Sequence, residues 1–476
     1  MASMVIRTGR ADLDFSGIRA EFGLPAEFPA AALAEAERAL SREPGAREDA
    51  TALPFVTIDP PGAKDLDQAL CLERVGDGFR VHYAIADLGL FVVPGGALDA
   101  EVRRRGQTLY LPDGNVPLHP TVLSEGAASL LPGQTRPAVL WTFDCDRTGE
   151  PVDVRVRRAV VRSTAQFDYE TVQHSFDAGA PHPSIEALAD FGRLRRERAA
   201  ERGAVELQLP EQEIVPNGDG DWKLAVRPRV DVDSWNAEIS LLTGMSAAKI
   251  MIGARVGVLR TLPDADDGAV DALKRSAHAL KVPWPPGTTP AKLLASLDPS
   301  RPESLALFVD ATRLLRGAGY TAFDGEIPPV TTHAGVAAPY THVTAPLRRL
   351  VDRFATEVCL AVTAGEDVPD WLRQALPLLP GLMGASDTLA SKVDRACLDQ
   401  VEAWVLADRV GQEFDAVVLR ADNNGADVFV AHPPVMGRCT GDDLPEGERV
   451  RVRLTEADPG DRKVVFARVA TTAPEA

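Results

Sequence analysis

The pattern of apolar residues changes character along the 476 residues, and this limits the possible folds more than any other feature. From residue 54, short apolar and β-branched runs alternate with turn residues, which is typical of strands. From about residue 185 the apolar spacing becomes helical. The tail returns to five short strand-like runs separated by Gly, Pro, Asn and Asp. One regular architecture does not accommodate these changes, so we expect an α+β protein of several domains.

We divide the chain into three parts. Residues 1–50 are rich in Ala, Glu and Arg, and helical patterns at 15–22 and 29–41 predict a small helical module, for which a helix-turn-helix is one option. Residues 51–404 are expected to form a large mixed domain. Residues 405–476 are expected to form a five-stranded OB barrel, because short strands with tight turns at this spacing suit a small closed sheet.

Composition narrows the class of protein. Hydrophobic residues make up 45% and charged residues 25%, as in a soluble globular protein, and we expect no association with a membrane. Five scattered cysteines without a CxxC pair predict reduced thiols and a cytoplasmic location. A net charge of −18 disfavours nucleic-acid binding unless a local basic channel supplies the phosphate contacts.

Three aspartates around a tight turn are the sharpest chemical feature. Asp59 ends the apolar run FVTI, and the turn PPGAK separates it from Asp65 and Asp67. Asp65 and Asp67 share a face if their segment is extended. Three such carboxylates repel one another unless a cation lies among them, and oxygen ligands suit Mg²⁺, which can activate water for phosphodiester hydrolysis. Aspartates in turns more often serve as caps, so the spacing alone leaves both interpretations open.

A second feature is the segment HAGVAAPYTHVTAPLRRLVDR, at residues 333–353. Pro346 stands at a natural helix start, so we expect Arg348 and Arg349 in the first helical turn. Cations there oppose the helix dipole. A negative partner should therefore compensate, either a phosphate or a neighbouring Asp or Glu.

These motifs, in this order, resemble the RNase II/RNase R (RNB) family of processive 3′→5′ exoribonucleases. The resemblance runs through FVTIDPPGAKDLDQAL, HYAIADLGLFVV, RGAVELQLPE and residues 333–353, which we call the arginine segment. It covers about residues 51–470. It implies a β-barrel-like sheet wrapped by helices, followed by an RNA-binding OB domain. It further implies a monomer that uses Mg²⁺, or Mn²⁺, to degrade single-stranded RNA from a free 3′ end to nucleoside 5′-monophosphates.

The resemblance assigns the chemistry to named positions. Asp59, Asp65 and Asp67 match three of the four metal-binding carboxylates of the family, and Asp65, Asp67 and Arg348 are the expected catalytic residues. Gln68 stands where the fourth carboxylate is usual, so it is a neutral ligand at best. Arg348 matches the arginine that contacts the scissile phosphate.

Further positions match RNA contacts. Tyr110 matches a tyrosine that seats the 3′-terminal nucleotide, and Tyr169 an aromatic residue that stacks on a terminal base. Glu238 and Arg349 are also expected to contact RNA. The family usually carries adjacent glutamates where this chain has Ala237 and Glu238.

Two other functions stay open at this point. Gln68 and Ala237 favour a non-catalytic RNA-binding or regulatory protein built on a decayed catalytic domain. The retained aspartates, Arg348 and both tyrosines oppose it. A metal-dependent phosphoesterase acting on DNA is the third hypothesis.

Overall fold

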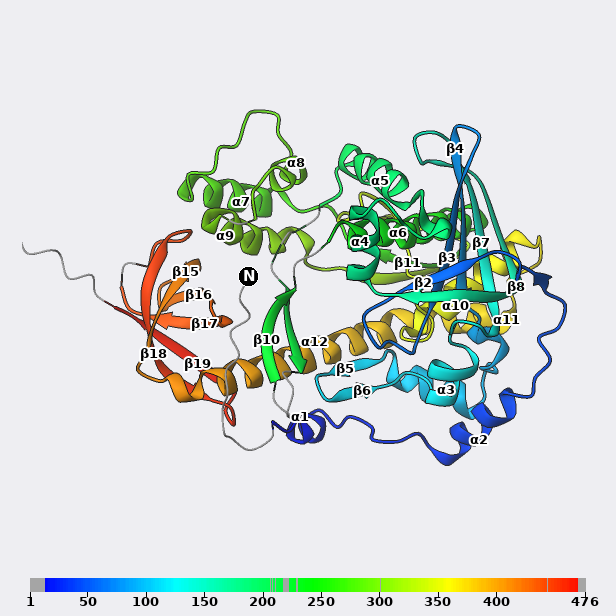
Figure 1. Cartoon of the computed structure of the whole chain (residues 1–476), viewed down its shortest axis with the longest axis horizontal. Helices are drawn as coiled ribbons and strands as arrows, with labels where there is room; N and C mark the ends of the chain where they lie inside the picture. The colour runs from blue at the N-terminus through cyan, green and yellow to red at the C-terminus, as the bar shows by residue number, and fades with distance from the viewer. Residues whose placement is uncertain are drawn as a thin grey trace, which may run out of the picture.

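The structure is a computed structural model of the chain. It describes residues 13–205, 207, 209, 211–216, 222–227, 230–299, 301–442 and 444–469. A mixed sheet with its helices lies at one end of the molecule, and a closed barrel lies at the other (Figure 1). The α+β architecture of several domains is therefore confirmed.

The sheet has six strands in the order β1 (Glu48–Asp49), β8 (Pro151–Phe167), β2 (Phe55–Ile58), β3 (Gln68–Val75), β4 (Gly78–Ala86) and β7 (Thr135–Cys145). Strand β7 also pairs with β8, so β8, β2, β3, β4 and β7 form a closed ring. This agrees with the expected barrel-like sheet. Large apolar side chains fill its core, among them Tyr83, Trp141 and Phe143, each 1% exposed or less.

Helices cover this sheet and extend from it. They are α3 (Ala97–Arg105), α4 (Tyr169–Asp177), α5 (Leu188–Arg202), α6 (Asp231–Ala254), α10 (Leu350–Thr363), α11 (Asp370–Ala375) and α12 (Leu379–Leu406). A smaller group, α7 (Asp267–Ala279), α8 (Pro290–Ala295) and α9 (Pro302–Ala311), has an apolar core of its own. The described residues also form two-stranded ribbons: β5 (Leu109–Leu111) with β6 (Gly114–Val116), β9 (Glu211–Pro216) with β10 (Trp222–Arg227), β11 (Val256–Thr261) with β12 (Gly319–Asp324), and β13 (Thr332–His333) with β14 (Ala338–Pro339).

The C-terminal domain is a closed barrel, as expected. Its strands are β15 (Glu413–Asp422), β16 (Gly425–Ala431), β17 (Pro434–Thr440), β18 (Arg449–Asp458) and β19 (Lys463–Arg468). They close in the order β15-β16-β17-β19-β18. Helix α12 runs from the sheet to this barrel (Figure 1), so one long element joins the two ends of the molecule.

The N-terminal region contains α1 (Ser16–Glu21) and α2 (Ala30–Ala39). Helix α2 packs on α3, whereas α1 packs against α12 (Figure 1). In the described residues 13–50 the two helices thus pack on different elements, which differs from the helix-turn-helix suggested by the sequence. Residues 1–12 lie outside the described residues.

Helix α6 is a long apolar helix at the centre of the mixed domain. Among the described helices it alone is long and apolar enough to cross a membrane, by length and composition only. Of the most apolar stretch of this helix, 56% is buried inside the protein, where α6 packs against α5, α10 and β11. The helix therefore packs as a core helix of a globular protein does.

Candidate active site

The three aspartates lie on the connection between β2 and β3. Asp59 directly follows β2, and its backbone N–H donates to the carbonyl of Phe167 at the end of β8, at 3.0 Å. Gly62 adopts a φ of +80° in the turn that follows, a conformation open to glycine. Asp67 directly precedes β3 and is 2% exposed. Strand pairing therefore fixes both ends of the segment from Asp59 to Asp67.

Residues 345–349 bring an amide and a cation to Asp67. The Leu347 N–H donates to Oδ1 of Asp67 at 2.7 Å, and Nε of Arg348 lies 3.4 Å from Oδ2. Helix α10 begins at Leu350, so the prediction that both arginines occupy its first turn is wrong. The Asp352 carboxylate accepts the N–H of Ala345 at 2.7 Å and holds residues 345–349 outside the helix.

The two arginines have different partners. Nε and Nη2 of Arg349 each lie 3.0 Å from the Asp352 carboxylate, and the Arg349 side chain is 21% exposed. The Arg348 side chain is 47% exposed and faces Asp67. A neighbouring aspartate thus compensates Arg349, while Arg348 keeps much of its guanidinium open to a ligand. A role for Arg349 in RNA contact stays a prediction.

Burial raises the pKa of Asp59 to about 7 and that of Asp67 to about 8, although Arg348 favours the charged form of both carboxyls. Both groups also interact with Asp65. Oδ2 of Asp59 is buried, and within the described chain it has no hydrogen-bond partner. The positive charge of Arg348 therefore does not offset the cost of burying charge on Asp59 and Asp67.

The shortage of positive charge near Asp59 and Asp67 bears on whether a metal ion fits among these carboxyls. In the part of the chain that the structure describes, no group of three or more His, Cys, Asp or Glu side chains could hold an ion. Mg²⁺, however, is usually held by one or two carboxylates together with water and substrate phosphates. The partnerless oxygen of Asp59 and the buried carboxyl of Asp67 fit that manner of binding. Nε2 of Gln68 donates to the carbonyl of Thr344 at 2.5 Å, which ties the start of β3 to the arginine segment.

Tyr110 reaches the site from the β5–β6 hairpin. Leu109 and Leu111 point into the protein, and alternation along the strand directs Tyr110 the other way, where it is 48% exposed. Its hydroxyl donates to Oδ2 of Asp65 at 3.0 Å. The Thr108 N–H donates to the carbonyl of Arg348 at 3.0 Å, so the base of the hairpin is fixed to the arginine segment.

Tyr169 reaches the site from the first residue of α4. The Asp168 side chain caps this helix by accepting the Thr171 N–H at 2.7 Å. The pKa of Tyr169 is raised by burial and by the nearby Asp59, and its side chain bonds to Asn236 on α6. The parallel pairing of β2 with β8 brings these residues together, because it places the start of α4 beside Asp59.

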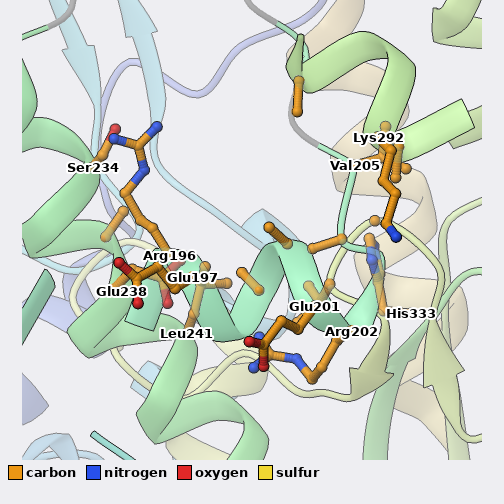
Figure 2. A pocket seen from close by; sticks show the side chains of 18 of the residues that line it. Arg196, Glu197, Glu201, Arg202, Val205, Ser234, Glu238, Leu241, Lys292 and His333 are labelled. Carbon is orange, nitrogen blue, oxygen red and sulfur yellow. The ribbon is translucent and has the colours of Figure 1, made fainter. Parts of the chain in front are cut away.

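Glu238 lies on a different face of α6 from Asn236, the residue that bonds to Tyr169. It lines a cavity of about 1080 Å³ between α5, α6 and α8, together with Ala237 and Arg196. Figure 2 shows Glu238, Arg196 and Ser234 on one wall of this cavity, with Lys292 and His333 across from them. Asn236 and Ser240, which contact Tyr169 and Tyr83, are spaced one turn apart on another face of the helix. Leu207 packs against the core of α7, α8 and α9.

Two groups at the candidate site were not predicted from the sequence. The Leu347 amide has no sequence signal, because every residue except proline carries one. His119 is 2% exposed, and its Nδ1–H donates to the carbonyl of the same Leu347 at 3.1 Å. Nothing in the local sequence joins His119 to a segment 228 positions away.

Two family models match the chain. The RNB domain matches residues 47–362, and the RNase II-type exonuclease C-terminal S1 domain matches residues 412–469. Ribonuclease R of Escherichia coli (strain K12) is 26% identical over 475 residues, covering 89% of this chain and 58% of that protein. Exosome complex exonuclease dis3 of Schizosaccharomyces pombe is 27% identical over 393 residues, covering 79% of this chain and 40% of that protein. The chain thus spans about half the length of these curated relatives.

Solved structures share the fold. The apo form of Mycoplasma genitalium RNase R aligns with a TM-score of 0.86 at 20% identity, covering 96% of this chain and 77% of the other. The same protein in complex with ribose methylated single-stranded RNA aligns with a TM-score of 0.85 at 19% identity, with the same coverage. Yeast Ssd1, a pseudonuclease, aligns with a TM-score of 0.66 at 16% identity, covering 92% of this chain and 53% of the other. Fold alone therefore does not decide activity. The motifs, their order and the two matching models nevertheless agree, and this chain belongs to the RNB family.

Proposed function

We propose that this protein is a processive, hydrolytic 3′→5′ exoribonuclease that degrades single-stranded RNA to nucleoside 5′-monophosphates. We further propose that it acts as a monomer in the cytoplasm and depends on Mg²⁺, with Mn²⁺ as a substitute. The observation that carries the proposal is the arrangement at Asp67. A buried carboxyl, held by the Leu347 amide, lies beside an arginine that keeps 47% of its side chain exposed.

The residues of this site suit a phosphodiester end. The open guanidinium of Arg348 can bind the scissile phosphate and offset charge that develops on it. Tyr110, bonded to Asp65, can help to seat the terminal nucleotide, and Tyr169, near Asp59, can stack on its base. Asp59, Asp65 and Asp67, with Gln68, would hold the metal ion, which when bound would lower the pKa of a water and polarise the phosphate.

The first experiment uses 5′-labelled RNA and the DNA of the same sequence, each with Mg²⁺ and with EDTA. We expect progressive shortening of the RNA from its 3′ end, with Mg²⁺ only. Cleavage of the DNA at a similar rate would favour a general phosphoesterase instead. RNA binding without shortening would favour a non-catalytic RNA-binding protein. Two observations favour the non-catalytic function: the Gln68 amide is bonded to the carbonyl of Thr344, and Ala237 stands where the family usually has a glutamate.

A point substitution tests the assignment of the site. Asp67→Asn replaces a carboxyl that can ionise with a neutral amide of nearly the same shape, so RNA binding should stay within a few fold while hydrolysis falls by about 10²-fold or more. Asp77→Asn is the matched control, since Asp77 lies in an exposed turn between β3 and β4. Turnover of Asp67→Asn near that of Asp77→Asn at saturating Mg²⁺ would refute the assignment.

A further inference from the structure

The β5–β6 hairpin that carries Tyr110 is too short to hold its own position. Each strand has three residues. A two-stranded ribbon is marginal in water even when it is longer. Backbone bonds fix the base of this hairpin to the arginine segment, but its tip, at Pro112 and Asp113, projects beyond them. Contacts from elsewhere in the fold must therefore set where Tyr110 lies.

The region of helix α1 and the hairpin belong to one apolar cluster. Phe15 and Ile18 are buried, at 0% and 1% exposed. They belong to the same apolar cluster as Leu109 and Leu111 of the hairpin. The cluster continues into α12 and the barrel, and Val116 of β6 is also part of it. One helix of the N-terminal region thus packs where three parts of the molecule meet (Figure 1).

Polar contacts fix α1 at both ends. Nη1 and Nη2 of Arg19 each bind one oxygen of Asp113, both at 2.8 Å, in a bidentate pair with the hairpin tip. Nε2 of Gln400 on α12 donates to the carbonyl of Asp14 at 2.9 Å. Glu21 forms an ion pair with Arg462 of the barrel. The helix therefore connects the hairpin tip to the barrel by directional contacts as well as by packing.

We propose that Arg19 is a positioning residue for Tyr110: through Asp113 it fixes the hairpin, and so keeps the Tyr110 hydroxyl on Asp65. Arg19 acts on the reaction only through the hairpin. The inference rests on the proposed exoribonuclease function, in which Tyr110 seats the terminal nucleotide. In this role, α1 connects the hairpin that positions the 3′-terminal nucleotide to the C-terminal barrel.

Charge reversal tests the pair. Arg19→Asp and Asp113→Arg should each lower kcat on RNA by about three- to tenfold with a smaller change in KM, because like charges then face each other at the hairpin tip. The double swap, with Asp at 19 and Arg at 113, should recover kcat to within about twofold. Arg74→Asp is the control, since Arg74 forms a surface ion pair with Asp190 on α5, away from the hairpin. A swap no better than either single variant would overturn the proposal.

A second measurement separates positioning from general stability. In a Tyr110→Phe background, which removes the hydroxyl bonded to Asp65, Arg19→Asp should cost much less of the remaining kcat than in the wild type. An equal loss in both backgrounds would overturn the proposal.

Hydrogen exchange makes the test independent of activity. Amides of residues 109–116 should exchange faster in Arg19→Asp and return to wild-type rates in the swap. Unchanged exchange would overturn the inference. If exchange follows the pair while the wild-type protein does not shorten RNA, the proposed function fails and the structural link between α1 and the hairpin stands.

Discussion

At the scale of single residues, the backbone of Leu347 joins Asp67 of the candidate site to a buried histidine. Its N–H binds the Asp67 carboxylate, and its carbonyl accepts the Nδ1–H of His119. Burial lowers the pKa of His119 to about 3, against a partial rise from the bond to Leu347. The imidazole is therefore neutral in the folded protein at neutral pH.

This pKa predicts an acid-sensitive contribution to stability. The unfolded histidine binds a proton near pH 6.5 and the folded one does not, so the contribution is complete above pH 6.5 and is lost as the pH falls toward 3. His119→Gln keeps an N–H donor but does not titrate. Between pH 6.5 and 5 the wild type should lose about 2 kcal/mol more of its unfolding free energy than His119→Gln. Urea unfolding at both pH values measures this, and parallel losses in the two proteins would contradict it.

Tyr169 gives a second residue-scale prediction. A short RNA has few phosphates left to contact the protein, so terminal stacking of about 1–3 kcal/mol forms a larger share of its binding free energy. Tyr169→Ala should therefore leave a longer final fragment, while the initial rate on long RNA falls less. Tyr169→Phe keeps the ring and should leave the wild-type fragment. The fragments are compared on a denaturing gel. If Tyr169→Ala melts as the wild type does and yields the same fragment, Tyr169 does not contact the RNA end.

At the scale of elements, α6 is fitted closely to the segment that leads to Arg348. A Cβ on Gly244 would overlap the ring of Tyr340 and press on the carbonyl oxygen of Thr341. The same helix contains Gly253, whose Cβ would meet no atom within 4 Å. The two glycines therefore offer the same substitution in one helix with and without a packed neighbour.

Gly244→Ala should destabilise the protein by about 1–3 kcal/mol, because the added methyl group has no room. It should also slow RNA degradation, since Tyr340 and Thr341 must move with the residues that follow them. Gly253→Ala should leave activity unchanged and raise stability by up to about 1 kcal/mol, from helix propensity alone. Thermal melts and initial rates of the pair decide the matter. Equal effects from both substitutions would show that α6 is not closely packed at Gly244.

At the scale of the whole molecule, the barrel is not an independent appendage. Its interior residues belong to one apolar cluster with Val401, Trp404 and Val405 of α12, and with Phe15, which directly precedes α1. The barrel core thus continues to α12, the N-terminal region and the β5–β6 hairpin, whereas the six-stranded sheet has a core of its own.

Deleting residues 412–476 should therefore destabilise what remains. Each apolar side chain returned to water costs about 1.5–3 kcal/mol, and losing several should lower Tm by at least about 5 °C. Exposed apolar surface should also promote self-association. Calorimetry and size-exclusion chromatography test this expectation. A truncated protein that stays monodisperse and melts at the wild-type temperature would show that the rest of the molecule does not depend on the barrel for its stability.

The sequence by itself determined the order of strand-rich and helical regions, the five-stranded barrel, and the turn that joins Asp59 to Asp65 and Asp67. These features are local, because periodicity and turn residues act over a few positions along the chain. The family motifs likewise occur as short continuous segments, so the family could be recognised before the structure was seen.

Only the tertiary structure decided which groups meet. Arg348 and Arg349 are neighbours in sequence, yet one faces Asp67 and the other pairs with Asp352. Glu238 lines a cavity between α5, α6 and α8, and its role in RNA contact stays a prediction. Arg19 meets Asp113 from 94 positions away. Such partners depend on how distant elements pack, and packing is set by the whole core rather than by any local pattern.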